Sequence, residues 1–145
     1  MKKCNEVMTK SPVCCLPSDL VTKAAQLMKS EHVGSIPVVE SEETQKLVGI
    51  LTDRDLALKI VADKLDANST KVEMVMTRKM VTCHAEDDLQ KAVDAMSENQ
   101  LRRIPIVDED NKILGIIAQA DVVMYFDHPK KAAAMVKEIS QKNVK

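Results

Sequence analysis

The stretch VMTKSPVCCLPSDLVTKAAQLMKSEHVGSIPVV, residues 7–39, returns later in the chain as VMTRKMVTCHAEDDLQKAVDAMSENQLRRIPIV, residues 75–107. The two copies align without a gap, from a shared Val-Met-Thr to a shared Ile-Pro. After a turn that is shorter in the second copy, LVGILTDRDL at 47–56 matches ILGIIAQADV at 113–122. A long match at a constant spacing indicates that one structural unit is present twice.

Each copy has the pattern of a β-α-β-β-α unit. A short strand is expected at Val13 and again at Val81, followed by a helix with one apolar face. Proline stands near the start of the next strand, where its missing N–H is tolerated. The apolar helix faces are expected to comprise Val21, Ala24, Ala25 and Met28 in the first copy, and Leu89, Ala92, Val93 and Met96 in the second.

The repeat predicts a mixed α/β (α+β) fold in which the two units pack about a pseudo-twofold axis. We expect repeat 1 at residues 5–65, a linker at 66–72, repeat 2 at 73–126, and a C-terminal helix and tail at 127–145. The C-terminal helix should turn Ala133, Val136 and Ile139 to one side. Neither copy buries its helices and sheet alone, so a ligand pocket is expected between the copies.

The composition excludes several classes of protein. The chain has 145 residues, 45% of them hydrophobic, yet it contains no Trp, one Tyr and one Phe. Its 21 basic and 22 acidic residues nearly cancel, which gives no field for nucleic acid. No apolar run is long enough for a bilayer, and the N-terminus lacks the apolar segment of a secretion signal. We therefore expect a cytoplasmic protein that binds neither nucleic acid nor membrane.

The duplicated unit, with VMT, SIPVV or RIPIV, and GILTDRDL in order, resembles a tandem pair of CBS (cystathionine β-synthase-type) domains, or Bateman module. The resemblance covers about residues 5–126. It implies a stand-alone regulatory module that binds an adenine nucleotide (AMP, ADP or ATP) in the cleft between the repeats. It also implies a homodimer that acts on a partner, here an unknown effector protein.

Thr52-Asp-Arg-Asp55 has two interpretations that the sequence leaves open. Thr52 followed three residues later by Asp55 approximates a capping box at a helix start, which requires no ligand. The resemblance implies instead that the Thr and the Asp hold a ribose, and a carboxylate suits a diol because it makes charge-assisted bonds. Both roles are compatible. A metal pair of Asp53 and Asp55 is disfavoured, because the two side chains diverge around a helix.

The resemblance also implies which residues line the clefts. Phosphate is held by basic residues before the proline-containing strand of the partner repeat, a place that Arg102 and Arg103 occupy in the second copy. Gly34 and Ser35 occupy it in the first copy, and Ala118 replaces Thr52 in the second. One cleft, here called the equipped cleft, therefore has the hydroxyl and the two arginines, and the other, the weaker cleft, lacks them. The equipped cleft is assigned Thr52, Asp55, Val81, Cys83, Arg102 and Arg103, and the weaker cleft Asp121, Val13, Cys15 and Ile36.

No catalytic set is apparent, so the protein is not expected to be an enzyme or to require a cofactor. The sequence has no phosphate-loop spacing and no HExxH motif. An alternative is a redox- or metal-responsive sensor that uses Cys15, Cys83 and His84, and another is an interaction scaffold with vestigial clefts. The four cysteines have no CxxC spacing, which favours small buried side chains over a metal site.

Overall fold

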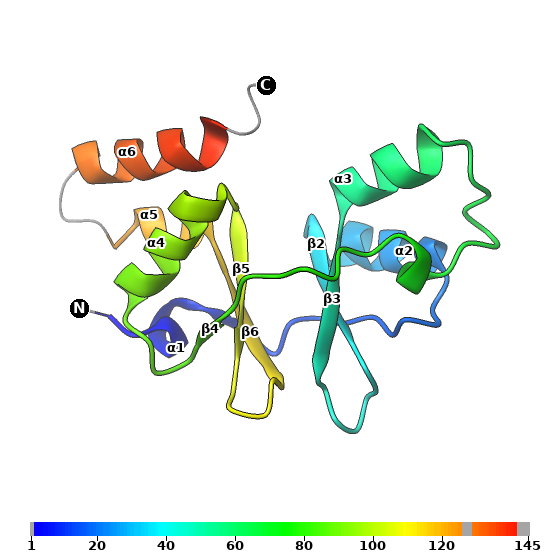
Figure 1. The fold of residues 1–145 in the computed structure, drawn as a ribbon, viewed down its shortest axis with the longest axis horizontal. Coiled ribbons are helices and arrows are strands. Elements are labelled where there is room, and N and C mark those ends of the chain that lie inside the picture. The colour runs from blue at the N-terminus through cyan, green and yellow to red at the C-terminus, as the bar shows by residue number, and fades with distance from the viewer. Residues whose placement is uncertain (1, 126–128, 142–145) are drawn as a thin grey trace. The chain divides into compact units, whose positions relative to one another are not determined.

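The computed structural model describes residues 2–125 and 129–141, although not the side chains of 129 and 130. The chain forms two compact units of mixed α/β structure, whose elements are labelled in Figure 1. Unit 1 comprises the described residues up to 11 together with 81–109 and those from 114 onward. Unit 2 comprises residues 12–80 and 110–113. The mixed α/β class expected from the repeat is confirmed.

The compact units do not follow the sequence copies residue for residue, because the two Val-Met-Thr segments are exchanged. Thr9 belongs to the first copy, yet it pairs with Ile116 in unit 1. Thr77 belongs to the second copy, yet it exchanges two 2.9 Å backbone hydrogen bonds with Ile50 in unit 2. The stretch 66–72, expected as a linker, also packs into unit 2, where Val72 is fully buried. Each unit therefore contains most of one copy and the Val-Met-Thr segment of the other.

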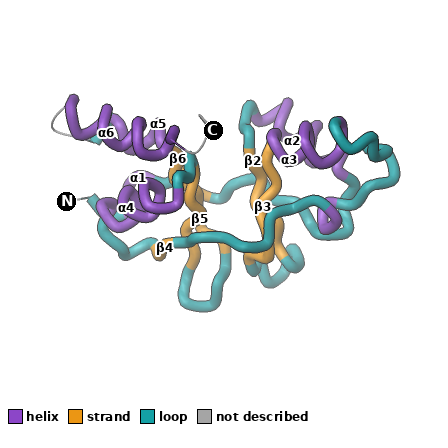
Figure 2. The backbone as a smooth tube through the Cα atoms, turned by 45° about the horizontal axis from the view of Figure 1, so that its top comes forward, coloured by secondary structure: helices purple, strands orange, loops and turns teal. Residues whose placement is uncertain are grey.

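Unit 1 contains a four-stranded sheet of order β1-β6-β5-β4. β1 is antiparallel to β6, and β4 is parallel to β5, with Cys83 opposite Ile106. Figure 2 shows these strands in orange and the helices of the unit in purple. The elements are α1 (Cys4–Val7), β1 (Thr9–Lys10), β4 (Cys83–His84), α4 (Leu89–Asn99), β5 (Arg103–Val107), β6 (Ile113–Ala118), α5 (Gln119–Val123) and α6 (Pro129–Ser140).

Unit 2 repeats the central pattern with fewer strands. β2 and β3 form an antiparallel pair in which Ser35 lies opposite Thr52. The strand expected at Val13 is reduced to one parallel bridge between Cys15 and Val38, the counterpart of the β4–β5 pairing in unit 1. The elements are α2 (Val21–Glu31), β2 (Ser35–Val39), β3 (Leu47–Thr52), α3 (Asp53–Leu56), the π-helix η1 (Ala57–Val61) and the 3₁₀-helix η2 (Val72–Met74).

The apolar faces of the helices agree with the sequence pattern in α4 but not entirely in α2. All four residues expected on the α4 face are buried. In α2 the expectation for Ala25 is wrong, because this side chain is exposed. Its counterpart Val93 lies in a core that also includes Met135 and Ile139 of α6, which packs against α4. Among the described residues, unit 2 has no helix corresponding to α6, so Ala25 stays uncovered.

The C-terminal helix α6 is confirmed, but its buried face differs from the expected one in one residue. Met135 is 3% exposed and Ile139 is fully buried, whereas Ala133 is exposed. Val136 is partly buried against the same core, as expected. Met135 and Ile139 are four residues apart and therefore share one side of the helix. The buried face of α6 therefore includes Met135 and not Ala133.

Two glycines allow the exchanged segments to approach the sheets closely. A Cβ atom on Gly49 would lie 2.6 Å from the sulfur of Met76, and one on Gly115 would lie 2.5 Å from the sulfur of Met8. Only glycine leaves room for a chain to pass at this distance. The shared glycine of the two copies is therefore explained by the methionine of the Val-Met-Thr segment that packs against it.

Candidate functional site

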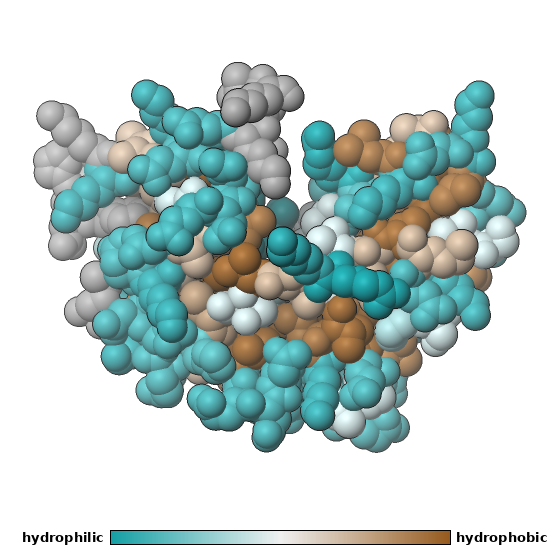
Figure 3. Space-filling model, viewed as in Figure 1, coloured by the Kyte–Doolittle hydropathy of each residue, from teal (hydrophilic) through white to brown (hydrophobic). Residues whose placement is uncertain are grey.

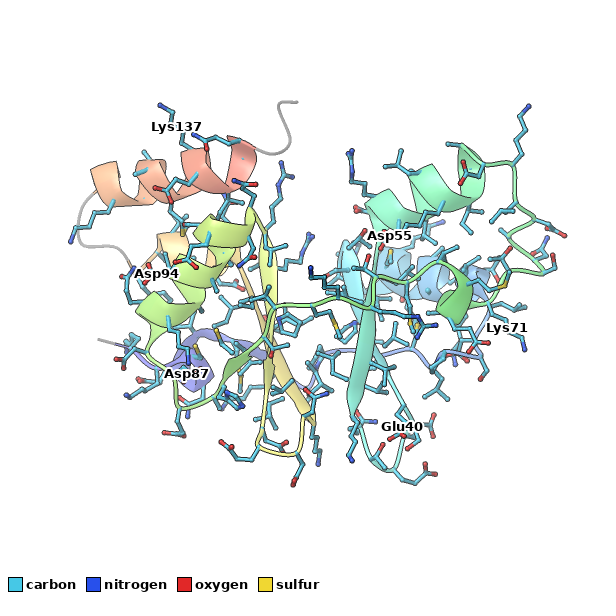
Figure 4. The ribbon with its side chains drawn as sticks, viewed as in Figure 1. Glu40, Asp55, Lys71, Asp87, Asp94 and Lys137 are labelled. Atoms are coloured by element: carbon cyan, nitrogen blue, oxygen red, sulfur yellow. The ribbon has the colours of Figure 1, made fainter. Side chains whose placement is uncertain are left out.

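The candidate site is centred on the junction between β3 and α3 in unit 2, where Asp55 is labelled in Figure 4. The Thr52 hydroxyl accepts the Asp55 amide at 3.0 Å, and the Asp55 carboxylate accepts the Thr52 amide through Oδ2 at 3.0 Å. This is the complete reciprocal capping box. The helix start is thus stabilised without a ligand, and the Asp55 carboxylate is held in one orientation.

Lys59 is a member of this site that the sequence interpretation missed. Its ammonium group lies 3.1 Å from Oδ1 of Asp55 and donates to the Val75 carbonyl at 2.9 Å. Asp55 therefore makes contacts through both carboxylate oxygens, and its side chain is only 13% exposed. The i,i+4 spacing of an acid and a lysine was the signal that would have identified this pair.

The second copy provides a weaker version of the same junction, between β6 and α5 of unit 1. Asp121 accepts the amide of Ala118 at 2.9 Å through Oδ2. Ala118 has no side-chain acceptor, so the reciprocal half of the box is missing, as the sequence predicts. The position of Lys59 is taken by Tyr125, which is 43% exposed. Asp121 is thus placed like Asp55 but without the hydroxyl and without the lysine.

Two further aspartates accept the backbone amide of the residue three positions earlier, so this contact recurs in the fold. Asp19 accepts the Leu16 amide, and Asp87, labelled in Figure 4, accepts the His84 amide, both at 2.8 Å. Both residues precede the helices α2 and α4 and do not lie in their first turns. The His84 amide is the main cause of a lowered pKa at Asp87. Capping alone therefore does not distinguish a ligand site from a structural one.

The residues that the sequence assigned to the equipped cleft belong to two units. Thr52 and Asp55 lie together in unit 2, whereas Val81, Cys83, Arg102 and Arg103 belong to unit 1. Within unit 1 the Arg102 carbonyl accepts the amide of Gln119 at 2.8 Å, which places Arg102 beside the start of α5. The Gly34 carbonyl makes the equivalent bond to Asp53 in unit 2 at 2.9 Å. The equipped set as a whole stays a prediction.

The apolar and cysteine residues assigned to the two clefts have mostly buried side chains. Cys83 is 2% exposed in the core of unit 1, and Val81 packs against that core. In unit 2, Cys15 is 1% exposed and Ile36 is fully buried, while Val13 is 36% exposed. A ligand at these positions would meet the backbone of the strands more than the side chains of the cysteines.

Comparison with known proteins identifies the duplicated unit. The family model for the CBS domain matches the chain twice, at residues 4–62 and 72–128. The chain belongs to the CBS domain family. The CBS pair is 35% identical to the CBS domain-containing protein YhcV of Bacillus subtilis, over 99% of both chains. It is also 35% identical to the inosine-5'-monophosphate dehydrogenase of Methanocaldococcus jannaschii, over 91% of this chain but only 25% of that enzyme.

Two solved structures have the same fold as this CBS pair. A crystal structure of the CBS domain pair of protein MJ0100, in complex with 5′-methylthioadenosine and S-adenosyl-L-methionine, superimposes with a TM-score of 0.76 at 26% identity. The match covers 87% of this chain and 96% of the MJ0100 chain. Hypoxic Response Protein I, with two coordinated zinc ions, gives a TM-score of 0.77 at 27% identity, over 86% of this chain and 99% of that one.

Three of the four cysteines of the CBS pair, Cys4, Cys15 and Cys83, are buried thiols. Burial raises the pKa of Cys15 to about 11, and the pKa of Cys83 is likewise raised chiefly by burial. Such thiols are protonated at neutral pH, which disfavours thiolate chemistry and metal coordination. His84 lies 3.8 Å from Asp87 through Nδ1. Across residues 2–125 and 131–141, no three His, Cys, Asp or Glu side chains gather in the manner of a metal site.

The described helices include none that is long and apolar enough to cross a membrane.

Proposed function

We propose that this CBS pair is a non-catalytic regulatory module that binds an adenine nucleotide, with the ribose hydroxyls on the Asp55 carboxylate. The phosphate-binding role that the resemblance implies for Arg102 and Arg103 stays a prediction. Binding would change how the module acts on an effector protein of unknown identity. AMP, ADP and ATP are the proposed ligands. The dehydrogenase activity of the longer Methanocaldococcus jannaschii relative is not part of the proposal, because the match covers 25% of that enzyme.

The observation that carries this proposal is the fixed, partly buried carboxylate of Asp55. The capping box holds one of its oxygens, and each carboxylate oxygen has two lone pairs, so both oxygens retain acceptor capacity for hydroxyl groups. The MJ0100 pair, with adenosyl ligands bound, supports the ligand class. A carboxylate that is already oriented loses little freedom when it binds a diol.

Calorimetric titration with AMP tests the proposal, using Asp55→Asn and the matched variant Asp121→Asn. Loss of a charge-assisted hydrogen bond is worth about 2 kcal/mol, which corresponds to roughly thirtyfold weaker binding for Asp55→Asn. Asp121→Asn should change the affinity by less than about threefold, because its junction lacks the hydroxyl and the lysine. Equal losses of affinity in the two variants would show that both copies contribute alike. If the wild type does not bind AMP, the proposed nucleotide binding is wrong.

We also propose a homodimer, supported by apolar side chains that remain exposed on η1 and directly after α5. Leu58 is 49% exposed, Val61 76% and Met124 83%. Figure 3 shows brown, apolar side chains at the surface over α3 and η1. Multi-angle light scattering at about 50 μM should give the mass of two chains, since an interface of standard size holds at that concentration.

A zinc-responsive module is a second candidate, favoured by the two zinc ions in Hypoxic Response Protein I. Of the residues that the sequence suggested for such a sensor, His84 has its Nδ1 3.8 Å from the carboxylate of Asp87. The raised pKa values of Cys15 and Cys83 weigh against their participation. Elemental analysis of protein purified without chelators, with His84→Ala as the control, distinguishes this candidate from nucleotide binding.

A further inference from the structure

Lys59 holds a positive charge in a fixed place beside the proposed ribose-binding carboxylate. Its ammonium group contacts Oδ1 of Asp55 at 3.1 Å and donates to the carbonyl of Val75 at 2.9 Å. The second contact is to a segment distant in sequence and does not involve the carboxylate. The ammonium group is therefore positioned by two acceptors, and a hydroxyl arriving at Asp55 leaves one of them in place.

Comparable acid–lysine pairs elsewhere in the chain show what is special about Lys59. Lys23 lies 3.5 Å from Asp19, and Lys91 lies 3.5 Å from Asp87, both at the same i,i+4 spacing. Lys59 makes the shortest of the three contacts and is the least exposed of the three lysines, at 43% against 57% and 65%. Among the described residues, Lys59 alone of these three lysines also donates to a backbone carbonyl.

The charge balance of this junction depends on Lys59. Between Thr52 and Lys59, the acids Asp53 and Asp55 are balanced by Arg54 and Lys59. Without Lys59, the segment has an excess negative charge, and Asp55 is the least solvated of its acids. A neutral ligand is little affected by such an excess, whereas a phosphate with a charge near −2 is repelled by it.

We infer that Lys59 determines the charge class of the ligand, so that the site accepts phosphate-bearing adenine nucleotides in preference to neutral or cationic adenosyl compounds. This inference rests on the proposed function at Asp55. Lys59 acts as a positioning and specificity residue: it neutralises the carboxylate that binds the ribose and adds positive charge near the phosphate. The second copy has Tyr125 at this position and lacks the charge.

Binding of AMP and of adenosine to Lys59→Met tests the inference, because the two ligands share the base and the ribose and differ in the phosphate. We expect AMP to bind about tenfold more weakly and adenosine to change by less than about twofold. Lys59→Arg should retain most of the preference for AMP. The difference should diminish at about 0.5 M salt, because salt screens the interaction between partly exposed charges.

Lys23→Met is the matched control, since it removes the same charge from an equivalent acid–lysine pair of the same unit. It should leave both affinities unchanged. Thermal unfolding of each variant, and Lys59→Gln if Lys59→Met does not fold, separates binding from stability. An equal loss for AMP and adenosine in Lys59→Met, with wild-type binding intact, overturns the inference alone. Absence of binding to both ligands in the wild type overturns the proposed function and the inference with it.

Discussion

Unit 1 and unit 2 are built from the same repeated pattern, yet they are completed differently. In unit 1, α6 packs on α4 and buries Ile139 in the core. In unit 2, Ala25 on the equivalent helix is exposed, and Leu58 and Val61 remain at the surface. Conversely, unit 2 has the complete capping box at Thr52 and the lysine beside Asp55. One unit thus has a covering helix, and the other has a hydroxyl and a lysine beside the carboxylate at its helix junction.

This difference shows that one repeated pattern can meet two different structural requirements. A buried face needs only apolar side chains of the right volume, and a helix from the end of the chain provides them. The proposed ligand site uses a hydroxyl, a carboxylate and an ammonium group, and the second copy has Ala118 and Tyr125 in place of the hydroxyl and the ammonium group. Three sets of variants test how far the two units differ.

Shortening Ile139 should have the largest effect. Ile139→Ala leaves a cavity in the fully buried core of unit 1 and should cost about 3 kcal/mol of folding free energy. The comparison is Ala25→Val, which adds a side chain at the exposed counterpart of Val93 and should change stability by less than about 0.5 kcal/mol. Urea denaturation measures both, and a loss below 1 kcal/mol for Ile139→Ala would contradict the role of α6 in the core.

The two glycines should differ in how well they tolerate a methyl group. Gly115→Ala brings Cβ to 2.5 Å from the Met8 sulfur and 2.8 Å from the Thr9 carbonyl, whereas Gly49→Ala meets the Thr77 carbonyl at 3.2 Å. A backbone atom moves less readily than a side chain, so we expect losses of about 2 and about 1 kcal/mol respectively. Combining Gly115→Ala with Met8→Ala should recover part of the loss in a double-mutant cycle. Additive losses would show that Met8 is not the neighbour that matters.

Exchanging the capping residues should have the smallest effect. Thr52→Ala removes the hydroxyl that accepts the Asp55 amide and should lower the free energy of unfolding by about 1 kcal/mol. Ala118→Thr supplies the missing hydroxyl in front of Asp121 and should raise it by about 0.5 kcal/mol. Thermal unfolding of the two variants gives opposite shifts if the cap is the difference between the junctions. Shifts of the same sign would show that the two helix starts differ in some other way.

Much of the local structure follows from the sequence pattern. The strands SIPVV and RIPIV, the glycine-containing strands after them and the helices α2 and α4 all lie where the repeat predicts. The capping box of Thr52 and Asp55 was also predictable, because the residues that form it are three positions apart. The candidate site was identified as far as Thr52 and Asp55 but without Lys59, although the spacing from Asp55 to Lys59 is equally local.

By itself, the sequence determined the duplication, the order of the elements, the family and the acid at each helix junction, because these depend on neighbours along the chain. Only the tertiary structure decided that Met8 packs on Gly115 and Met76 on Gly49, so that the Val-Met-Thr segments are exchanged. It also decided that α6 covers α4, and that the Val75 carbonyl holds Lys59 beside Asp55. A periodic pattern shows which face of a helix or strand is apolar, but not which distant segment covers it, because that choice depends on how the whole chain packs.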